Sequence, residues 1–256
     1  DRATILRISD AAAKAGHGKA QQYAEWAVRE TGMGVAAHKK MKNEACSTGL
    51  VDLYRGEDFV APRIHAERKI VELPRPAGVI FALVPVTNPV ATVFFKSLLA
   101  LMTRNAIILS PHPQAKECCA DAVRTLADAA RAAGAPDGCI QVIAEPTIPL
   151  IENLMSDSRV DLIVATGGPA VVKAAYRSGN PAIGVGPGNA PSVVDDTADL
   201  KLAAKRIVAS KAFDNSILCT NESTVLAFDA IADRLLDAMK AERAHICSKD
   251  EADKLR

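Results

Sequence analysis

The sequence predicts an α/β protein built on a doubly wound parallel sheet. Strand-like and helix-like segments alternate between residues 78 and 212, and one helix between successive strands makes neighbouring strands parallel. The segment Gly78–Val84 is also a continuous apolar run, as expected for a strand that helices cover on both faces. Ligands of such sheets bind beyond the carboxyl ends of the strands. The segments that follow each strand are therefore the ones in which we expect a site.

Residues 1–57 are predicted to be helical. Ala11–Glu30 is rich in Ala, Lys, Gln and Glu and carries apolar residues at helical spacing. Two glycines interrupt this pattern, and a second helix then extends to about Tyr54. Arg68–Leu73 alternates between apolar and polar residues and is followed by prolines, which predicts a strand.

The next 130 or so residues are expected to form the sheet and its helices, with Pro in the first turn of several helices or Gly and Pro after their last turn. The predicted strands are Gly78–Val84, Ala106–Leu109, Ile140–Ile143, Asp161–Ala165, Ala182–Val185 and Ser192–Val194. The predicted helices are Pro89–Met102, Pro113–Ala133, Ile148–Met155, Gly168–Ser178 and Leu200–Ala212.

A change of domain is expected near residue 212. Phe213–Cys219 breaks the preceding helix, and a new strand, Thr224–Phe228, and a new helix, Ala230–Lys240, follow. We therefore assign residues 1–212 to one domain and residues 213–256 to the beginning of another.

Composition and charge narrow the class of protein. Hydrophobic residues make up 49% of the 256 residues and charged residues 24%, which is typical of a globular protein. The net charge of +1 gives no electrostatic reason to expect nucleic acid or an anionic membrane as a partner. The richest apolar stretch, Ala77–Val86, is far shorter than the ~20 residues that span a bilayer. No signal peptide is visible. The sequence starts at Asp1 without Met and ends at Arg256 in a helix-like segment, so we expect a piece of a longer protein.

The six cysteines differ in their surroundings. Their number in a chain of this length does not indicate a disulfide scaffold, and a reducing cytoplasm is the favoured location. No Cys-x-x-Cys pair occurs and the histidines are scattered, so no metal site is predicted. Cys118, Cys119 and Cys139 lie in a helix or at a strand start, where cysteine is usually a small buried hydrophobe. Cys219 lies in a polar, turn-prone segment and is the candidate nucleophile.

Asn88 stands between a buried strand and a helix, after Thr87. One interpretation is that Thr87 or Asn88 caps the helix with its side chain. The other is that the Asn88 amide donates a hydrogen bond to a developing oxyanion.

Two glycine-rich segments follow strands. Thr166-Gly-Gly-Pro169 opens a helix, where backbone N–H groups suit a phosphate, although many ordinary strand-to-helix turns also contain glycine. Gly184-Val-Gly-Pro-Gly-Asn-Ala-Pro191 lacks the spacing of a dinucleotide fingerprint and does not open a helix. It is either a ligand loop or a tight connection between two strands.

Nine short runs give the chain a family resemblance. They are Val84–Pro89, Phe95–Ser97, Thr103–Ile108, Ser110–Pro113, Ala165–Pro169, Val172–Tyr176, Ala182–Gly186, Gly188–Asn189 and Asp214–Cys219. In content and order they resemble the aldehyde dehydrogenase superfamily, and specifically its CoA-acylating branch, which includes the acetaldehyde dehydrogenase half of aldehyde–alcohol dehydrogenases and sulfoacetaldehyde dehydrogenase. The resemblance implies a Rossmann-like cofactor domain followed by a second α/β catalytic domain.

The same resemblance implies roles for individual residues. Cys219 is expected to attack the aldehyde carbonyl, and Asn88, helped by the backbone N–H of Cys219, to stabilise the oxyanion. The expected cofactor is NAD or NADP, with coenzyme A as co-substrate. The positions expected to border the dinucleotide are Pro85, Thr87, Ser110, His112, Pro113, Thr166, Gly167, Gly168, Gly184, Val185 and Gly186.

The implied reaction converts a short aldehyde, such as acetaldehyde or sulfoacetaldehyde, into an acyl-CoA through a cysteine thiohemiacetal and a thioester. Hydrolytic members of the superfamily carry a Glu general base in a Glu-Leu-Gly-Gly segment. The corresponding stretch here, Ile183–Gly188, contains no carboxylate, which favours transfer to CoA. A nucleotide-binding fragment without turnover and a hydrolytic enzyme that releases the free acid stay open as alternatives.

The resemblance leaves the choice between the two nicotinamide cofactors open. Ser110–Pro113 contains no acidic residue that could hold a ribose 2′-hydroxyl, so this loop tolerates a 2′-phosphate without requiring one. The full-length protein is expected to be a cytoplasmic homo-oligomer, with a bacterial microcompartment as a second location.

Overall fold

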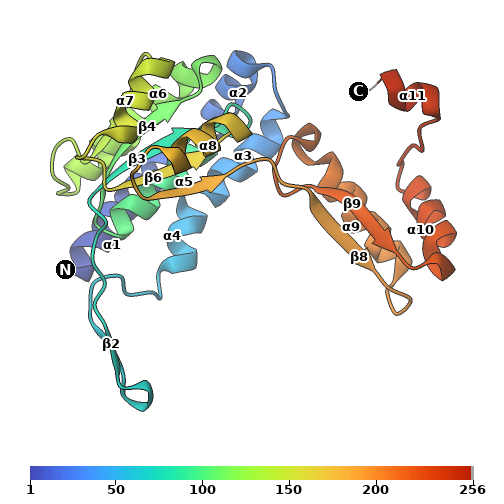
Figure 1. Ribbon diagram of the computed structural model, residues 1–256, viewed down its shortest axis with the longest axis horizontal. Helices are drawn as coiled ribbons and strands as arrows, with labels where there is room; N and C mark the ends of the chain where they lie inside the picture. Colours follow the sequence, from blue (N-terminus) through green and yellow to red (C-terminus); the bar gives the residue numbers. More distant parts are fainter. Residues whose placement is uncertain (255–256) are drawn as a thin grey trace. The chain divides into compact units, whose positions relative to one another are not determined.

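The computed structural model describes residues 1–254 (Figure 1). By its internal contacts the chain divides into two units, Asp1–Pro187 and Gly188–Arg256. This division precedes the domain boundary that the sequence predicts after residue 212. The reason is that strand β8 (Ala190–Val194) and helix α9 (Leu200–Ala212) pack with strand β9 (Glu222–Ala227) and helix α10 (Asp229–Ala241).

A five-stranded parallel sheet forms the centre of the first unit, with strand order β5-β4-β3-β6-β7. The strands are β3 (Val79–Val84), β4 (Ala106–Pro111), β5 (Ile140–Val142), β6 (Leu162–Thr166) and β7 (Ala182–Val185). The chain adds β4 and β5 on one side of β3 and then β6 and β7 on its other side. The winding therefore reverses between β3 and β6, and the predicted doubly wound sheet is confirmed.

Helices cover both faces of this sheet (Figure 1). They are α5 (Pro89–Met102), α6 (Lys116–Ala132), α7 (Ile148–Ser156) and α8 (Pro169–Arg177). Along β3, Ile80, Ala82 and Val84 belong to the core that contains α5 and α6, whereas Phe81 and Leu83 belong to the core that contains α7 and α8. Because successive side chains of a strand point to opposite faces, a strand between two helix layers must be apolar throughout.

The N-terminal region contains four helices where the sequence predicts two. They are α1 (Arg2–Gly18), α2 (Ala20–Thr31), α3 (Ala36–Ala45) and α4 (Thr48–Tyr54). The predicted continuous helix over Ala11–Glu30 is wrong because the chain turns at Lys19, whose ψ of 10° departs from helical geometry. The second break follows Cys46, where the Ser47 hydroxyl donates to the Asn43 carbonyl at 2.7 Å. None of the helices within residues 1–254 is long and apolar enough to cross a bilayer.

A β-hairpin interrupts the first unit before the sheet begins. Strand β1 (Arg63–His65) pairs antiparallel with β2 (Ile70–Glu72), and a 3-10 turn joins them. The strand predicted over Arg68–Leu73 is therefore shorter than expected, and its partner β1 is an element that the sequence does not predict. Ile64 is 76% exposed and Val71 is 59% exposed, so this hairpin carries apolar side chains outside the core.

The second unit has its own small core. Strands β8 and β9 pair in parallel, and Val194 packs with Ile207 of α9 and Leu235 of α10. The predicted strand Ser192–Val194 is thus part of a two-stranded sheet rather than of the five-stranded one. Helix α11 (Lys249–Lys254) is the last element within the described residues, and the expectation for Arg256 lies outside them.

Candidate functional site

The carboxyl ends of the strands bring the predicted cofactor segments to one edge of the sheet. Leu83 of β3 pairs with Ser110 of β4 and with Ala165 of β6, and Ala165 pairs with Gly184 of β7. These residues form one row across the sheet, at the edge where open α/β sheets bind ligands. Every predicted cofactor position, from Pro85 to Gly186, belongs to the first unit, as does Asn88, whereas Cys219 belongs to the second.

Lys96 of α5 lies where the winding of the sheet reverses. Its Nζ donates to the carbonyl oxygen of Leu83 in β3 at 2.7 Å and to that of Val164 in β6 at 2.8 Å. The side chain is buried, and desolvation lowers the pKa of Lys96 to about 7. A neutral amine keeps two N–H groups, so both bonds persist after deprotonation. Sequence reasoning assigned Lys96 no role, although a single charged residue in the apolar helix Pro89–Met102 is a usable signal.

Asn88 is the N-cap of α5 through its backbone only. Its carbonyl oxygen accepts from the backbone N–H of Thr92 at 3.1 Å and from the Thr92 hydroxyl at 2.6 Å. Its side chain makes no bond to the first turn of the helix. Instead, Oδ1 accepts from Nζ of Lys42 and Nδ2 donates to Oγ1 of Thr87 at 3.2 Å. The side-chain capping interpretation of Asn88 is therefore wrong.

The turn after β6 is open to a ligand. Strand β6 ends at Thr166, and α8 begins at Pro169 with Gly168 as its N-cap and with no capping side chain. A Cβ atom added at Gly168 would meet no atom within 4 Å, so a phosphate can approach the backbone closely. A helix N-terminus favours such an anion. This turn therefore stays the predicted phosphate site.

The end of β4 and the residues that follow it, Ser110–Pro113, are buried or hydrogen-bonded at several points. Ser110 is 2% exposed, and its buried hydroxyl has no hydrogen-bond partner among the described residues. The backbone N–H of His112 donates to the Val84 carbonyl at 3.1 Å, and its ring Nδ1 accepts from the backbone N–H of Gln114 at 3.2 Å. These bonds fix His112 at the end of β4, between the other two predicted cofactor positions of this segment, Ser110 and Pro113.

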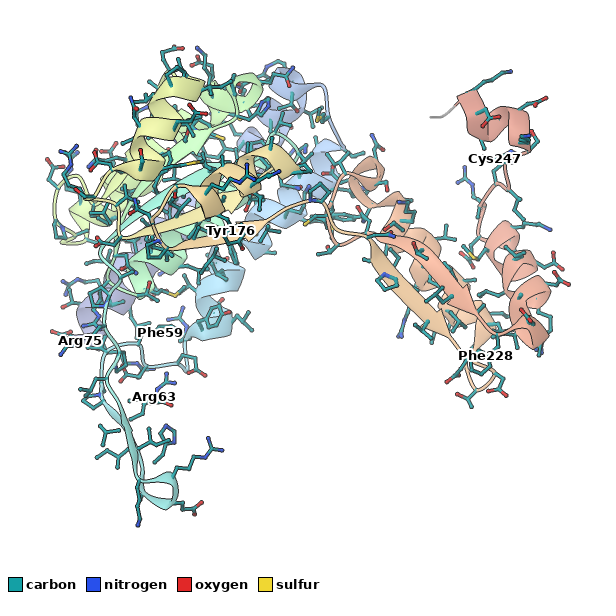
Figure 2. All side chains as sticks on the ribbon, in the orientation of Figure 1. Phe59, Arg63, Arg75, Tyr176, Phe228 and Cys247 are labelled. Carbon is teal, nitrogen blue, oxygen red and sulfur yellow. The ribbon has the colours of Figure 1, made fainter. Side chains whose placement is uncertain are left out.

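Gly184 has a packing role that sequence reasoning did not predict. A Cβ atom there would lie 2.6 Å from Cγ1 of Val172 and 2.8 Å from the ring of Tyr176, which Figure 2 labels. The backbone N–H of Gly184 donates to the Tyr176 hydroxyl at 2.9 Å. Gly184 and Val185 end β7, and residues 186–189 lead to β8. The segment therefore joins two strands, and the ligand interpretation of its glycines stays a prediction.

Cys219 lies in an exposed turn between a 3-10 segment (Phe213–Ser216) and β9. Asn221, only 4% exposed, closes this turn. Its Oδ1 accepts from the backbone N–H of Leu218 at 2.9 Å, and its Nδ2 donates to the Ser210 carbonyl. The side chain of Asn221 thereby ties the turn after Cys219 to two backbone groups that precede it. Sequence reasoning missed Asn221, and its place in a turn-prone segment was too general a feature to single it out.

The backbone before Cys219 is strained. Asp214, Asn215 and Ser216 have φ values of 52°, 55° and 62°, so three successive non-glycine residues adopt the left-handed conformation. Each such residue costs about 1–3 kcal/mol and persists only when its surroundings enforce it. Strain of this kind concentrates at functional sites, and here it is three residues from the candidate nucleophile. Cys118 and Cys119 are buried, as predicted, and Cys139 is half-buried.

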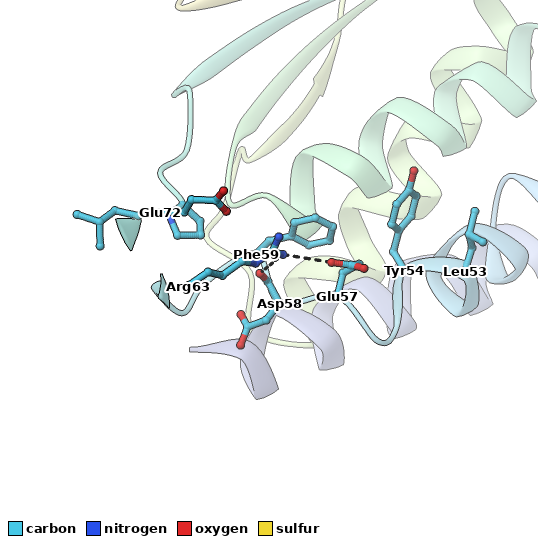
Figure 3. A pocket seen from close by; sticks show the side chains of 9 residues that line it. Leu53, Tyr54, Glu57, Asp58, Phe59, Arg63 and Glu72 are labelled. Atoms are coloured by element: carbon cyan, nitrogen blue, oxygen red, sulfur yellow. Dashed lines mark hydrogen bonds and ion pairs between the residues drawn. The ribbon is translucent and has the colours of Figure 1, made fainter. Parts of the chain in front are cut away.

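Two other kinds of candidate site were considered within residues 1–254: a surface hollow and a metal centre. A hollow of about 640 Å³ lies at the base of the hairpin, beside Tyr54 and Phe59 (Figure 3). Arg63 there pairs with Glu57 at 3.2 Å and donates to the Asp58 carbonyl at 2.8 Å. None of the predicted site residues lines this hollow. No group of three or more His, Cys, Asp or Glu side chains within these residues is placed to hold a metal ion.

Comparisons with known proteins find a family profile, curated relatives and solved structures that are similar to this chain. The profile of the aldehyde dehydrogenase family matches residues 1–254. The aldehyde-alcohol dehydrogenase of Clostridium acetobutylicum is 42% identical over 236 residues, which cover 92% of this chain and 27% of that protein. An acetylating aldehyde dehydrogenase from Geobacillus thermoglucosidasius superposes with a TM-score of 0.91 at 37% identity, covering 98% of this chain and 56% of that one.

A third similar protein is the propionaldehyde dehydrogenase of Rhodopseudomonas palustris, solved with bound CoA and an acylated cysteine. It superposes with a TM-score of 0.87 at 30% identity, covering 100% of this chain and 58% of that one. The chain thus spans about a quarter of the curated relative and a little over half of the two solved chains. Since the family profile covers nearly all of its residues, the chain belongs to the aldehyde dehydrogenase family.

Proposed function

We propose that the protein carrying this chain oxidises a short aldehyde to an acyl-CoA, with NAD or NADP as the oxidant. The observation that carries this proposal is the exposed turn of Cys219, whose backbone Asn221 fixes. It gains weight from the propionaldehyde dehydrogenase of R. palustris, in which a cysteine is acylated and CoA is bound. Acetaldehyde and sulfoacetaldehyde are the substrates that the sequence resemblance favours.

In the first step Cys219 acts as a thiolate, which is the nucleophilic form of the side chain. Its Sγ forms a bond to the aldehyde carbon, and the carbonyl π electrons move to the oxygen. The Asn88 amide and the backbone N–H of Cys219 stabilise the resulting oxyanion, as donors of this kind do in acyl-transfer enzymes. The product of this step is a thiohemiacetal on Cys219.

Loss of a hydride from this thiohemiacetal leaves a thioester on Cys219, and a nicotinamide dinucleotide supplies the hydride acceptor when bound. Gly167 and Gly168 would hold its pyrophosphate, because the turn after β6 is open to an anion. Ser110, His112 and Pro113 would border the same ligand from the end of β4. Pro85, Thr87, Thr166, Gly184, Val185 and Gly186 are the remaining positions proposed for it.

The thioester is then attacked by the thiolate of CoA, which forms the acyl-CoA and releases Cys219 as a thiolate. Water would need a general base for the same attack. Residues 183–188 contain no carboxylate, so transfer to CoA is favoured over hydrolysis. A hydrolytic enzyme and a fragment that binds nucleotide without turnover are the two alternatives that the experiment below distinguishes.

The test compares the whole protein that carries this sequence with its Cys219→Ala variant. Reduction of NAD+ and NADP+ by short aldehydes is followed with and without CoA, and the product is identified by mass. Cys247→Ala is the matched control, since Cys247 is also exposed. We expect CoA-dependent reduction in the parent and in Cys247→Ala, and loss of about 10³-fold or more in Cys219→Ala.

Other results of that test separate the alternatives. Equal reduction without CoA, with a free acid as product, identifies a hydrolytic enzyme. Nucleotide binding by the 256-residue chain without turnover, beside an active whole protein, identifies a binding fragment. Activity that survives Cys219→Ala contradicts the proposed nucleophile.

We further propose that the protein is a homo-oligomer and acts in the cytoplasm or in a bacterial microcompartment. The exposed apolar side chains of the hairpin, Ile64 and Val71 among them, support association because such side chains are usually buried at interfaces. Light scattering on the whole protein and fractionation of its host cells test these two points.

A further inference from the structure

Two lysines of α3 reach the loop that carries Asn88. Lys39 and Lys42 are three residues apart and therefore lie on one face of the helix. Nζ of Lys39, which is 3% exposed, donates to the Thr87 carbonyl at 2.8 Å. Nζ of Lys42 donates to Oδ1 of Asn88. One lysine thus holds the backbone of the loop and the other holds its amide side chain.

The Lys42 contact determines which end of the amide faces outward. An ammonium group has only donors, so the amide atom that meets it must be the oxygen. The NH2 group of Asn88 is therefore turned away from Lys42. One of its N–H bonds is directed at Oγ1 of Thr87, 3.2 Å away. The second N–H stays available for an acceptor such as an oxyanion.

The surroundings leave this amide little freedom. The hollow that Lys39, Lys42, Asn43 and Asn88 help to line is small, about 10 Å³. The contact between Nζ of Lys42 and Oδ1 of Asn88 is a direct hydrogen bond. The Asn88 backbone is fixed by its two bonds from Thr92. What remains variable is the side-chain rotation, which the bonds to Lys42 and Thr87 restrict.

We propose that Lys42 is a positioning residue for the oxyanion donor: it holds Oδ1 of Asn88 so that the amide N–H, and not the carbonyl oxygen, is presented to the reacting aldehyde oxygen. This inference rests on the function proposed above. The competing role for Lys42 is purely structural, as a link between α3 and the start of α5. If the role of Lys42 is structural, replacing Lys42 should change kcat by the same factor whether Asn or Ala stands at position 88.

A double-mutant cycle separates the two roles. In the whole protein, Lys42→Met is made alone and together with Asn88→Ala, because methionine keeps the length of the side chain but has no donor. Lys40→Met is the matched control, since Lys40 lies on the same helix, has a side chain that is 43% exposed and pairs with Glu44 at 3.6 Å. Lys42→Arg keeps a donor-only cation. Each variant is assayed for kcat, for KM of CoA and aldehyde, for nucleotide Kd and for Tm.

We expect Asn88→Ala to lower kcat by about 10²–10³-fold. Lys42→Met should lower kcat by about tenfold or more with nucleotide Kd unchanged, and Lys42→Arg should recover part of the loss. In the Asn88→Ala background, Lys42→Met should change kcat by less than about twofold, because residues that act as one unit are not additive. Lys40→Met should behave as the parent protein.

Three results would overturn the proposal. An equal loss from Lys42→Met in both backgrounds shows a structural link. If Lys42→Met has the same kcat as Lys40→Met while Asn88→Ala is impaired, Lys42 has no role in positioning Asn88. The proposed function is then unaffected. Parent-like activity in Asn88→Ala and in Cys219→Ala refutes the proposed function itself, and this inference with it.

Discussion

The ammonium nitrogen of Lys96 lies 2.7 Å from the carbonyl oxygen of Leu83, and this bond spans the gap between helix α5 and the strand at which the sheet reverses. A second bond, to Val164 in the neighbouring strand, makes Lys96 a clamp across the two central strands. Burial of this side chain lowers its pKa to about 7 from its ordinary 10.5.

Lys96 should make the stability of the protein rise with pH. Between pH 7 and 10.5 the unfolded chain binds a proton that the folded chain lacks, so the free energy of unfolding increases by up to ~1.4 kcal/mol per pH unit. Below pH 7 Lys96 is charged in both states and this contribution is absent. Lys96→Met should abolish it. Urea unfolding at several pH values tests this, with the exposed Lys14→Met as control. A stability difference between parent and Lys96→Met that does not change with pH would contradict the prediction.

Asn88→Asp should separate catalysis from stability. The carboxylate keeps an acceptor for Lys42, and the backbone carbonyl that accepts from Thr92 is unchanged. It has lost the amide donor, so kcat should fall by about 10²–10³-fold while Tm stays close to that of the parent. Thermal unfolding and steady-state kinetics on the same samples measure both quantities. A large loss of Tm with kcat retained would assign Asn88 to the fold alone.

Gly184→Ala should destabilise the first unit by about 1–3 kcal/mol, the usual cost of overpacking. The added Cβ would lie 2.6 Å from Cγ1 of Val172, and α8 must move to admit it. Val172→Ala in the same chain removes that methyl group and should restore part of the loss. Chemical unfolding of Gly184→Ala, Val172→Ala and the double variant gives the comparison. No rescue by Val172→Ala would indicate that Tyr176 is the limiting contact.

In contrast to Gly184→Ala, Gly168→Ala should weaken nucleotide binding without lowering stability. Its φ of −69° suits any residue, and the added Cβ meets no neighbour, so stability should be unchanged. The methyl group would keep a phosphate from the backbone N–H groups. Losing one such bond to a charged group costs ~1.5–3 kcal/mol, or about tenfold or more in nucleotide Kd. Calorimetric titration with NAD+ and NADP+ measures it, and unchanged affinity for both would exclude this turn as the phosphate site.

Glu30 should stabilise α6 from outside that helix. Its carboxylate accepts from the backbone N–H groups of Glu117 at 2.8 Å and Cys118 at 2.9 Å, which are in the first turn of α6. Glu30→Ala should therefore lower the free energy of unfolding by about 1–2 kcal/mol. Glu25→Ala, an exposed position on the same helix, is the control and should have little effect. Equal losses from both variants would contradict the capping role.

The strands of the five-stranded sheet were predictable because their apolar runs are local features of the sequence. Their ends agree with the structure to within two residues or so, the usual precision of element boundaries. Strand β1 was not predictable, since a three-residue strand has no periodicity and depends on a partner, β2, that lies further along the chain. The break at Lys19 was missed although Gly16 and Gly18 precede it, because isolated glycines in a run rich in Ala and Lys are tolerated inside helices.

In the candidate site, too, some residues were predictable from the sequence and others were not. Residues at strand ends, such as Asn88 and Gly168, were found because a parallel sheet places all of its carboxyl ends at one edge. Lys42 was not found, because it lies 46 residues from Asn88 and its role depends on how α3 packs. Asn221 was missed for a related reason: its side chain bonds to backbone atoms that only the folded turn brings near.

The left-handed run Asp214–Ser216 restricts which sequences the segment before the nucleophile can acquire by mutation. Glycine and asparagine adopt this conformation at low cost, whereas β-branched residues are strongly disfavoured there. Most substitutions in this stretch would therefore destabilise the segment before Cys219. The backbone conformation thus limits which residue types can stand at positions 214, 215 and 216. This limit is separate from any chemical role of their side chains.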